Sequence, residues 1–134
     1  MSTEPRLWFD GYIEAFNRSD FAGFGAYYAD DVEFIGQAGR FQGREAVLDF
    51  YRTVKTRMSE VLAVRQFVGV PDRLAVEIDT RLEARMDWPD FPTGPLKAGD
   101  RIGVISFVFY DVSGGLFTRI RSAGYRRVVG GWAP

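Results

Sequence analysis

Tyrosine and carboxylate side chains are the groups of this chain that could carry chemistry, because it contains neither cysteine nor histidine. That absence excludes thiolate nucleophiles, imidazole bases and the Ser-His-Asp and Cys-His arrangements. Proton transfer would depend on Asp, Glu, Tyr, Lys, Arg or water. Tyr12 and Tyr51, each on an apolar helical stripe, are predicted as the catalytic hydroxyls. A structural hydrogen bond in a closed core explains the same pair equally well, since a buried phenol needs a partner.

Asp79 is the acid that we predict as a base, with Asp87 and Asp90 near a plausible pocket mouth as alternatives. It lies in a run, residues 74–86, that alternates between apolar and charged residues and therefore predicts a strand. If the apolar even-numbered residues face inward, Asp79 belongs to a solvated or dimer-facing ladder of charge pairs. A slip of one residue would instead turn Asp79 and Arg81 into the pocket.

Hydrophobic periodicity predicts the elements that position these side chains. Helices are predicted over residues 5–16, 20–28 and 44–58, the first with Thr3 as its cap. Strands are predicted over residues 32–36, 61–70, 74–86, 101–112 and 116–128, with a turn at 39–43 and a loop at 87–99. Three helices followed by a mostly antiparallel curved sheet predict a single α+β domain over residues 1–134.

The order of elements resembles the nuclear-transport-factor-2-like (NTF2-like) superfamily, and within it the SnoaL-like branch of polyketide cyclases, ketosteroid isomerases and limonene-epoxide hydrolases. The matching segments are YIEAFNRSD at 12–20, YADD at 28–31, GREAVLDFY at 43–51, FPTG at 91–94 and GGLFTRIR at 114–121. The resemblance implies a sheet that curls around the helices into a cone with an open pocket. It also implies a dimer formed through the opposite face of the sheet.

The resemblance further implies where the functional side chains of known activities would stand. Tyr12 matches the oxyanion donor of the isomerases, and Tyr51 matches the tyrosine that supports it. The acidic positions do not match. In the isomerases and cyclases, the acidic positions correspond to Gly36, Ser106 and Val108 of this chain. In the epoxide hydrolases, the catalytic strand positions correspond to Ile78, Thr80 and Ser122. The usual form of each activity therefore lacks its acid in this chain.

The predicted pocket is an apolar chamber with a few hydroxyls, suited to a flat hydrophobic ligand held by one or two hydrogen bonds. The residues predicted to bind that ligand are Phe16, Tyr28, Phe34, Ile78, Thr80, Leu82, Trp88, Phe91, Ser106, Val108, Ile120 and Ser122. Two of them, Trp88 and Phe91, belong to the proline-rich segment 87–97. That segment either covers the mouth of the cone or is a stiff connector.

Composition restricts the possible partners. A net charge of −1 argues against a nucleic-acid or polybasic membrane binder, and no apolar run reaches the length of a membrane span. No metal-ligand cluster or phosphate loop is present, so neither a metal nor another cofactor is predicted. An apolar outer row of Ile105, Phe107 and Phe109 predicts a homodimer. Without a signal peptide, the cytoplasm is the default location.

Three hypotheses for function remain. The first is a small-molecule-binding protein with an apolar, tyrosine-bearing pocket. The second is an isomerase, dehydratase or cyclase that acts on a hydrophobic carbonyl compound through Tyr12 and an Asp base. The third is a dimerisation or accessory module whose cone is filled. The content of the cone distinguishes them, because only the first two need an open chamber, and only the second needs a carboxylate within it.

Overall fold

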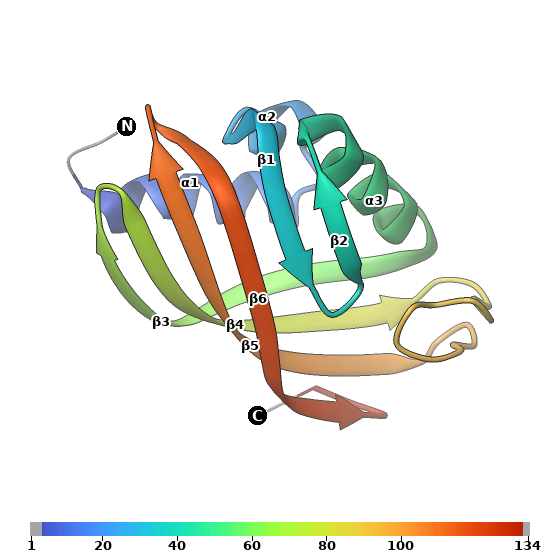
Figure 1. The fold of residues 1–134 in the computed structure, drawn as a ribbon. Helices are drawn as coiled ribbons and strands as arrows, with labels where there is room; N and C mark the ends of the chain where they lie inside the picture. Colours follow the sequence, from blue (N-terminus) through green and yellow to red (C-terminus); the bar gives the residue numbers. More distant parts are fainter. Residues whose placement is uncertain (1–3, 133–134) are drawn as a thin grey trace.

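The computed structural model describes residues 4–132, in which three helices pack against one curved, unclosed sheet (Figure 1). The helices are α1 (Pro5–Asn17), α2 (Phe21–Gly25) and α3 (Arg44–Arg57). The strands are β1 (Tyr28–Gly36), β2 (Gly39–Gln42), β3 (Met58–Val70), β4 (Arg73–Ala84), β5 (Arg101–Ser113) and β6 (Leu116–Val129). They lie in the order β2-β1-β6-β5-β4-β3, and every neighbouring pair is antiparallel except β1 with β6. The predicted α+β cone is confirmed.

The core is aromatic because α1 turns its apolar stripe toward the sheet. Phe9, Tyr12 and Phe16 on that stripe are buried, and they pack with Phe24 of α2 and Phe117 of β6. Burial of an aromatic ring removes about 150–250 Å² from water, so this cluster anchors the helices inside the curve of the sheet. The predicted cap of α1, Thr3, lies outside the described residues.

Three differences from the sequence prediction affect the shape of the sheet. Residues 39–42, predicted as part of a turn, form the short strand β2, which pairs with β1 in a hairpin. Tyr28 opens β1 instead of closing the second helix. Strand β3 begins at Met58, directly after α3, because Met58 already has an extended backbone (φ −151°, ψ 157°). No connector therefore separates α3 from β3, and residues 58–60 gain a defined face of the sheet.

The strand register sets which side chains enter the cone. Ile78 lies opposite Ser106, and Thr80 lies opposite Val104, so the even-numbered residues of β4 and β5 share the inner face. The predicted inward orientation of the apolar residues of β4 is confirmed, and the alternative slip does not occur. The hairpin between β5 and β6 turns at Gly114 and Gly115, which both have positive φ (60° and 75°), as a tight two-residue turn requires.

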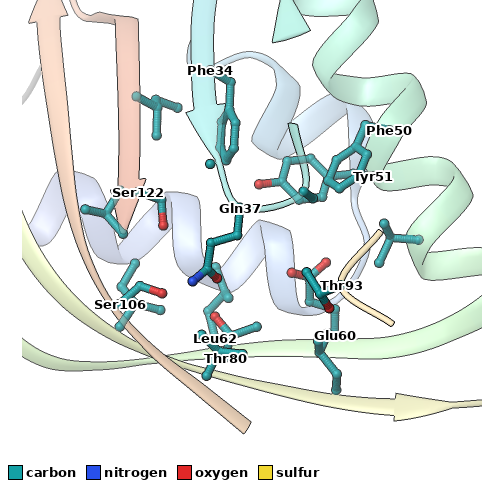
Figure 2. Close-up of a pocket in the computed structure, with 18 of the residues that line it drawn as sticks. Phe34, Gln37, Phe50, Tyr51, Glu60, Leu62, Thr80, Thr93, Ser106 and Ser122 are labelled. Atoms are coloured by element: carbon teal, nitrogen blue, oxygen red, sulfur yellow. The ribbon is translucent and has the colours of Figure 1, made fainter. Parts of the chain in front are cut away.

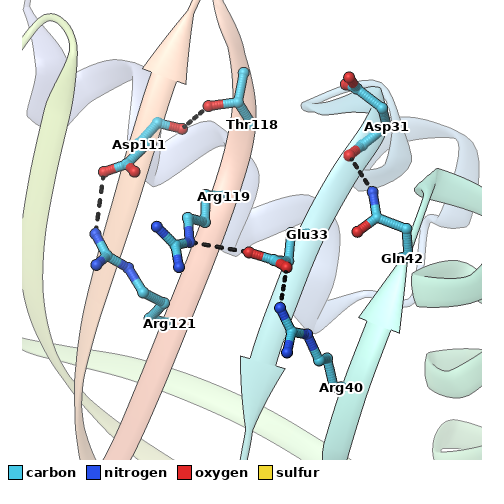
Figure 3. Close-up of polar contacts among 8 residues, drawn as sticks. All are labelled: Asp31, Glu33, Arg40, Gln42, Asp111, Thr118, Arg119 and Arg121. Carbon is cyan, nitrogen blue, oxygen red and sulfur yellow. Dashed lines mark hydrogen bonds and ion pairs between the residues drawn. The ribbon is translucent and has the colours of Figure 1, made fainter.

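The outer face of the sheet combines exposed aromatic rings with ion pairs. Phe107 and Phe109 are 55% and 47% exposed, as the predicted outer row requires, whereas Ile105 is only 1% exposed and cannot form part of an open patch. Arginines of β6 pair with carboxylates (Figure 3). Arg119 lies 3.0 Å from Glu33, and Arg121 lies 3.4 Å from Asp111. These pairs reduce the positive charge that β6 would otherwise present to a polyanion.

No helix among residues 4–132 is long and apolar enough to cross a membrane.

Candidate functional site

A cavity of about 160 Å³ opens between the inner face of the sheet and the helices (Figure 2). Each of the main strands contributes inward side chains to it, and α1 and α3 contribute one wall. The lining residues are Tyr12, Phe34, Gly36, Gln37, Ala38, Phe50, Tyr51, Val54, Glu60, Leu62, Ile78, Thr80, Leu82, Phe91, Thr93, Ile102, Val104, Ser106, Val108, Tyr110, Ile120 and Ser122. The cone is therefore open, and most of its lining is apolar.

Most of the predicted pocket residues meet at this cavity. Both predicted catalytic tyrosines line it, together with Phe34, Ile78, Thr80, Leu82, Phe91, Ser106, Val108, Ile120 and Ser122. Three residues predicted to bind the ligand, Phe16, Tyr28 and Trp88, are not among those that line the cavity. Phe16 is packed edge-on against Tyr51 within the core, and Tyr28 lies behind Tyr12 as its hydrogen-bond partner. Trp88 is buried in a second apolar cluster, where its ring meets that of Phe91.

Tyr12 pairs with Tyr28 rather than with Tyr51. The two hydroxyl oxygens lie 2.7 Å apart, and both side chains are buried, so each phenol satisfies the other. Burial raises the pKa of Tyr12 and Tyr28 well above the ordinary value for a phenol. Burial likewise raises the pKa of Tyr51. All three hydroxyls therefore stay protonated at neutral pH, and Tyr12, which lines the cavity, can act as a hydrogen-bond donor.

Asp79 lies on the face of β4 that points away from the cavity. It alternates with the lining residues Ile78 and Thr80, and its carboxylate Oδ2 lies 3.4 Å from the guanidinium of Arg81. Although it points outward, it is only 4% exposed. Its neighbour Glu77 accepts hydrogen bonds from Gln66 and Tyr125, which lower its pKa. Glu77 and Asp79 are thus buried carboxylates on the outer face of β4, whereas Arg81 is exposed, and this row supplies no acid to the cavity.

Glu60 is the acid that sequence reasoning missed. It lies on the inner face of β3, opposite Leu82, and Figure 2 shows its side chain pointing from the strand toward the cavity. Its Oε1 atom is inaccessible to solvent and has no hydrogen-bond partner among the described residues. Burial raises the pKa of the Glu60 carboxyl from 4.5 to about 7, although the charge of Lys55 opposes that rise. Such a carboxyl can both accept and donate a proton near neutral pH.

Two side chains hold the backbone around Glu60. Lys55, buried near the end of α3, donates from Nζ to the carbonyl oxygens of Phe16 (2.7 Å) and Glu60 (3.2 Å). Asn17, the last residue of α1, donates from Nδ2 to the Leu62 carbonyl (2.9 Å) and accepts from the Leu62 amide (2.8 Å). The ends of α1 and α3 are therefore tied to the start of β3 at Glu60 itself and at Leu62, which holds Glu60 in place at the cavity.

The mouth of the cavity carries polar groups from a loop and a hairpin. Gln37, in the turn between β1 and β2, and Thr93, in the proline-rich segment, line both the cavity and an adjoining surface hollow that Arg126 and Arg127 also line. Arg127 donates from Nη1 to the Thr93 carbonyl at 3.1 Å, which ties the segment to β6. Phe91 reaches the cavity from the same segment, so this loop forms part of the chamber wall.

Among residues 4–132, no group of three or more His, Cys, Asp or Glu side chains could hold a metal ion. The lining offers hydroxyls, one amide and one carboxyl, which suit an organic ligand better than a cation.

Known proteins share this architecture. A SnoaL-like polyketide cyclase from Agrobacterium tumefaciens matches with a TM-score of 0.73 and 20% identity, covering 94% of each chain. An LEH-like epoxide hydrolase from M. tuberculosis matches with a TM-score of 0.71 and 14% identity, over 89% of this chain and 80% of that one. A computationally designed 17-OHP binder matches with a TM-score of 0.71 and 20% identity, over 92% of this chain and 96% of the design. At these identities the likeness concerns the fold.

No curated protein matches the sequence. The family model of the SnoaL-like domain, in contrast, matches residues 9–120, which include most of α1, the whole of β5 and the first part of β6. The chain therefore belongs to the SnoaL-like domain family, within the NTF2-like superfamily.

Proposed function

We propose that the protein binds a flat, hydrophobic small molecule in the cone. The observation that carries this proposal is the open cavity itself, whose lining is mainly aliphatic and aromatic and whose polar groups are few and directed. A filled cone would have favoured a purely structural module. The designed relative, which is described as a 17-OHP binder, supports the idea that this fold accommodates a small organic ligand.

Binding of 2-acetylnaphthalene, a flat aromatic ketone, tests the proposal by isothermal titration calorimetry and by amide chemical-shift mapping. We expect a saturable interaction whose shift changes cluster on the lining residues of β4 and β5. Thr80→Phe would fill the cavity and should weaken binding by at least about tenfold, whereas Val61→Phe, on the outer face of β3, should leave it unchanged. Shift changes confined to the outer face would overturn the proposal, whatever the affinity.

We propose as a second function that the cavity acts on carbonyl compounds, with the Tyr12 hydroxyl as the donor to the carbonyl oxygen. The hydroxyl pair of Tyr12 and Tyr28 supports this role, because Tyr28 can orient a donor that lines the cavity. Tyr51 also lines the cavity and is a second possible donor. Asp79, on the other face of β4, is not part of the proposal.

A matched pair of ligands tests the donor. Replacement of Tyr12 by Phe should weaken binding of 2-acetylnaphthalene by about 3–10-fold, the equivalent of one hydrogen bond, and should leave binding of 2-ethylnaphthalene unchanged. Equal effects on the two ligands would remove Tyr12 as a carbonyl donor. Tyr51→Phe, measured in the same way, separates the two hydroxyls.

We further propose that two copies pair through the outer face of the sheet. Phe107 and Tyr125 stack there with their ring centroids 4.7 Å apart, and Phe109 is exposed beside them. A row of aromatic rings this exposed is unusual on an isolated domain. Light scattering should give twice the mass of one chain, and Phe107→Glu should halve it; a wild-type protein of monomer mass at about 100 μM would refute the dimer.

A further inference from the structure

Glu60 differs from every other group around the cavity. Among the lining residues that the structure describes, it is the one with a carboxylate, ammonium or guanidinium group. Glu60 as a residue is half-buried, but its Oε1 atom is withdrawn from solvent and has no hydrogen-bond partner among the described residues, although buried polar atoms normally have one. Burying a carboxyl oxygen without a hydrogen bond costs free energy of folding. Since no neighbouring group uses this oxygen, it can bind a group that enters the chamber.

The charged and titratable groups around Glu60 come from two helices. Within residues 4–132, Lys55 of α3 is the cation whose charge acts on it. The Lys55 ammonium donates to two carbonyl oxygens and lies 4.0 Å from the centre of the Phe16 ring. The negative charge of Glu60 also contributes to the raised pKa of Tyr12 of α1 and of Tyr51 of α3. Neither lysine nor tyrosine donates a hydrogen bond to the carboxyl within the described residues, so no neighbour neutralises it by direct contact.

These observations point to a role that the resemblance to known activities does not supply. Gly36, Ser106 and Ser122, which correspond to acidic positions in those activities, do line the cavity, but none of them can move a proton as a base. We propose that Glu60 is the acid–base group of the cone, and that the pocket takes an apolar compound with an acidic C–H proton next to a carbonyl. This inference rests on the proposed small-molecule pocket.

The step is a proton transfer. A Glu60 carboxylate oxygen takes the proton from the carbon next to the carbonyl, and the electron pair of that C–H bond moves into an enolate whose oxygen accepts a hydrogen bond from Tyr12. Glu60, now protonated, returns the proton to another carbon of the conjugated system, so an isomer leaves and the enzyme regains its carboxylate. Because the pKa of Glu60 lies near neutrality, both forms are populated during such a cycle.

Base-promoted ring opening of 5-nitrobenzisoxazole tests the role without knowledge of the natural ligand. A base removes the proton on carbon 3, its electron pair forms the nitrile, and the N–O bond breaks to release a coloured phenolate. The folded wild-type protein should catalyse this reaction with a pH–rate profile that rises to a plateau with a midpoint near 7. Glu60→Gln should reduce the rate by at least about 100-fold, the usual contribution of a general base.

Two variants make the comparison sharp. Asp79→Asn removes a buried carboxylate on the opposite face of the sheet and should retain the wild-type rate and midpoint. Glu60→Asp keeps the carboxylate but shortens it, so it should retain a pH-dependent rate even if that rate is lower. Circular dichroism verifies that each variant is folded before its rate is compared.

Each outcome decides between the proposals. Probe binding with a rate that is unchanged in Glu60→Gln would overturn the role of Glu60 and leave the binding pocket intact. A probe that causes no chemical-shift changes on the lining residues would overturn the pocket, and the role of Glu60 with it. Loss of the rate in Asp79→Asn, with Glu60→Gln active, would transfer the role to the outer face.

Discussion

Replacing Glu60 by Gln should stabilise the protein in a way that depends on pH. In the wild-type protein the unfolded chain releases the Glu60 proton near pH 4.5, whereas the folded protein holds it until about pH 7. Between these values folding takes up a proton, so the free energy of unfolding falls as the pH rises. Gln has nearly the same shape and cannot ionise. The free energy of unfolding of the variant therefore lacks this decrease with pH.

The size of the effect follows from the two pKa values. Each tenfold change in proton affinity corresponds to about 1.4 kcal/mol, so the difference between 4.5 and about 7 corresponds to about 3 kcal/mol. This figure is an upper value, because the ammonium of Lys55 loses its opposite charge in the variant. The gain should be near zero at pH 4.5, should grow through pH 7 and should be complete by pH 8.5.

Urea denaturation followed by tryptophan fluorescence, at pH values from 4.5 to 8.5, measures the difference between the two proteins. Glu45→Gln is the matched control, since Glu45 lies in the first turn of α3 with its side chain 75% exposed. The control accounts for the loss of one negative charge; because Glu45 lies at a helix N-terminus, its replacement should lower the free energy of unfolding by at most about 1 kcal/mol, opposite in sign to the gain expected for Glu60→Gln. A gain for Glu60→Gln that stays within about 0.5 kcal/mol over the whole range would refute the buried, unpaired state of this carboxyl.

Three further changes test the groups that surround the cavity. Tyr28→Phe should lower the free energy of unfolding, measured by urea denaturation, by about 1–3 kcal/mol because it leaves the Tyr12 hydroxyl without a partner. Adding Tyr12→Phe should recover part of that loss. If the effects of the two substitutions on the free energy of unfolding simply add, the hydrogen bond between the two tyrosines is contradicted. Asn17→Ala should raise hydrogen exchange of the amides at the start of β3 with little change in β5, and uniform exchange would argue against a local clamp. Lys55→Met should move the carbon-13 titration midpoint of the Glu60 carboxyl above 7, whereas an unchanged midpoint would show that the lysine does not act on it.

The elements with strong periodicity were predictable. The apolar stripe of α1 and the alternation of β4 follow directly from the 3.6-residue and two-residue repeats, and the structure confirms both. Strand β2 was not predictable, because its four residues lie between Gly36 and Gly43 and read as a turn. Only pairing with β1 makes it a strand, and such tertiary contacts are invisible in a local pattern.

The acid in the cavity was missed for a related reason. The sequence pattern predicts a helix that ends at residue 58 and a strand that begins at residue 61, which leaves Glu60 in a connector with no assigned face. The structure continues β3 back to Met58, and Glu60 then shares the inner face with Leu62 and Val64 through simple alternation. The sequence pattern that identifies it is the two-residue alternation of the strand, which places the Glu60 carboxylate on the same face as the apolar Leu62 and Val64.

The position of Glu60 also constrains the orientation of a ligand. Figure 2 shows Ser106 and Ser122 on one side of the cavity and Glu60 on the other. Ser106 and Ser122 occupy positions where the resemblance places acids of known activities, so a proton-transfer centre here would lie at the opposite side. A ligand would then direct its reactive carbon toward β3 and its remaining polar groups toward the hydroxyls of β5 and β6. Every second residue of each strand points to the inner face of the sheet. Proteins with this fold can therefore carry their catalytic acid on different strands without a change of fold.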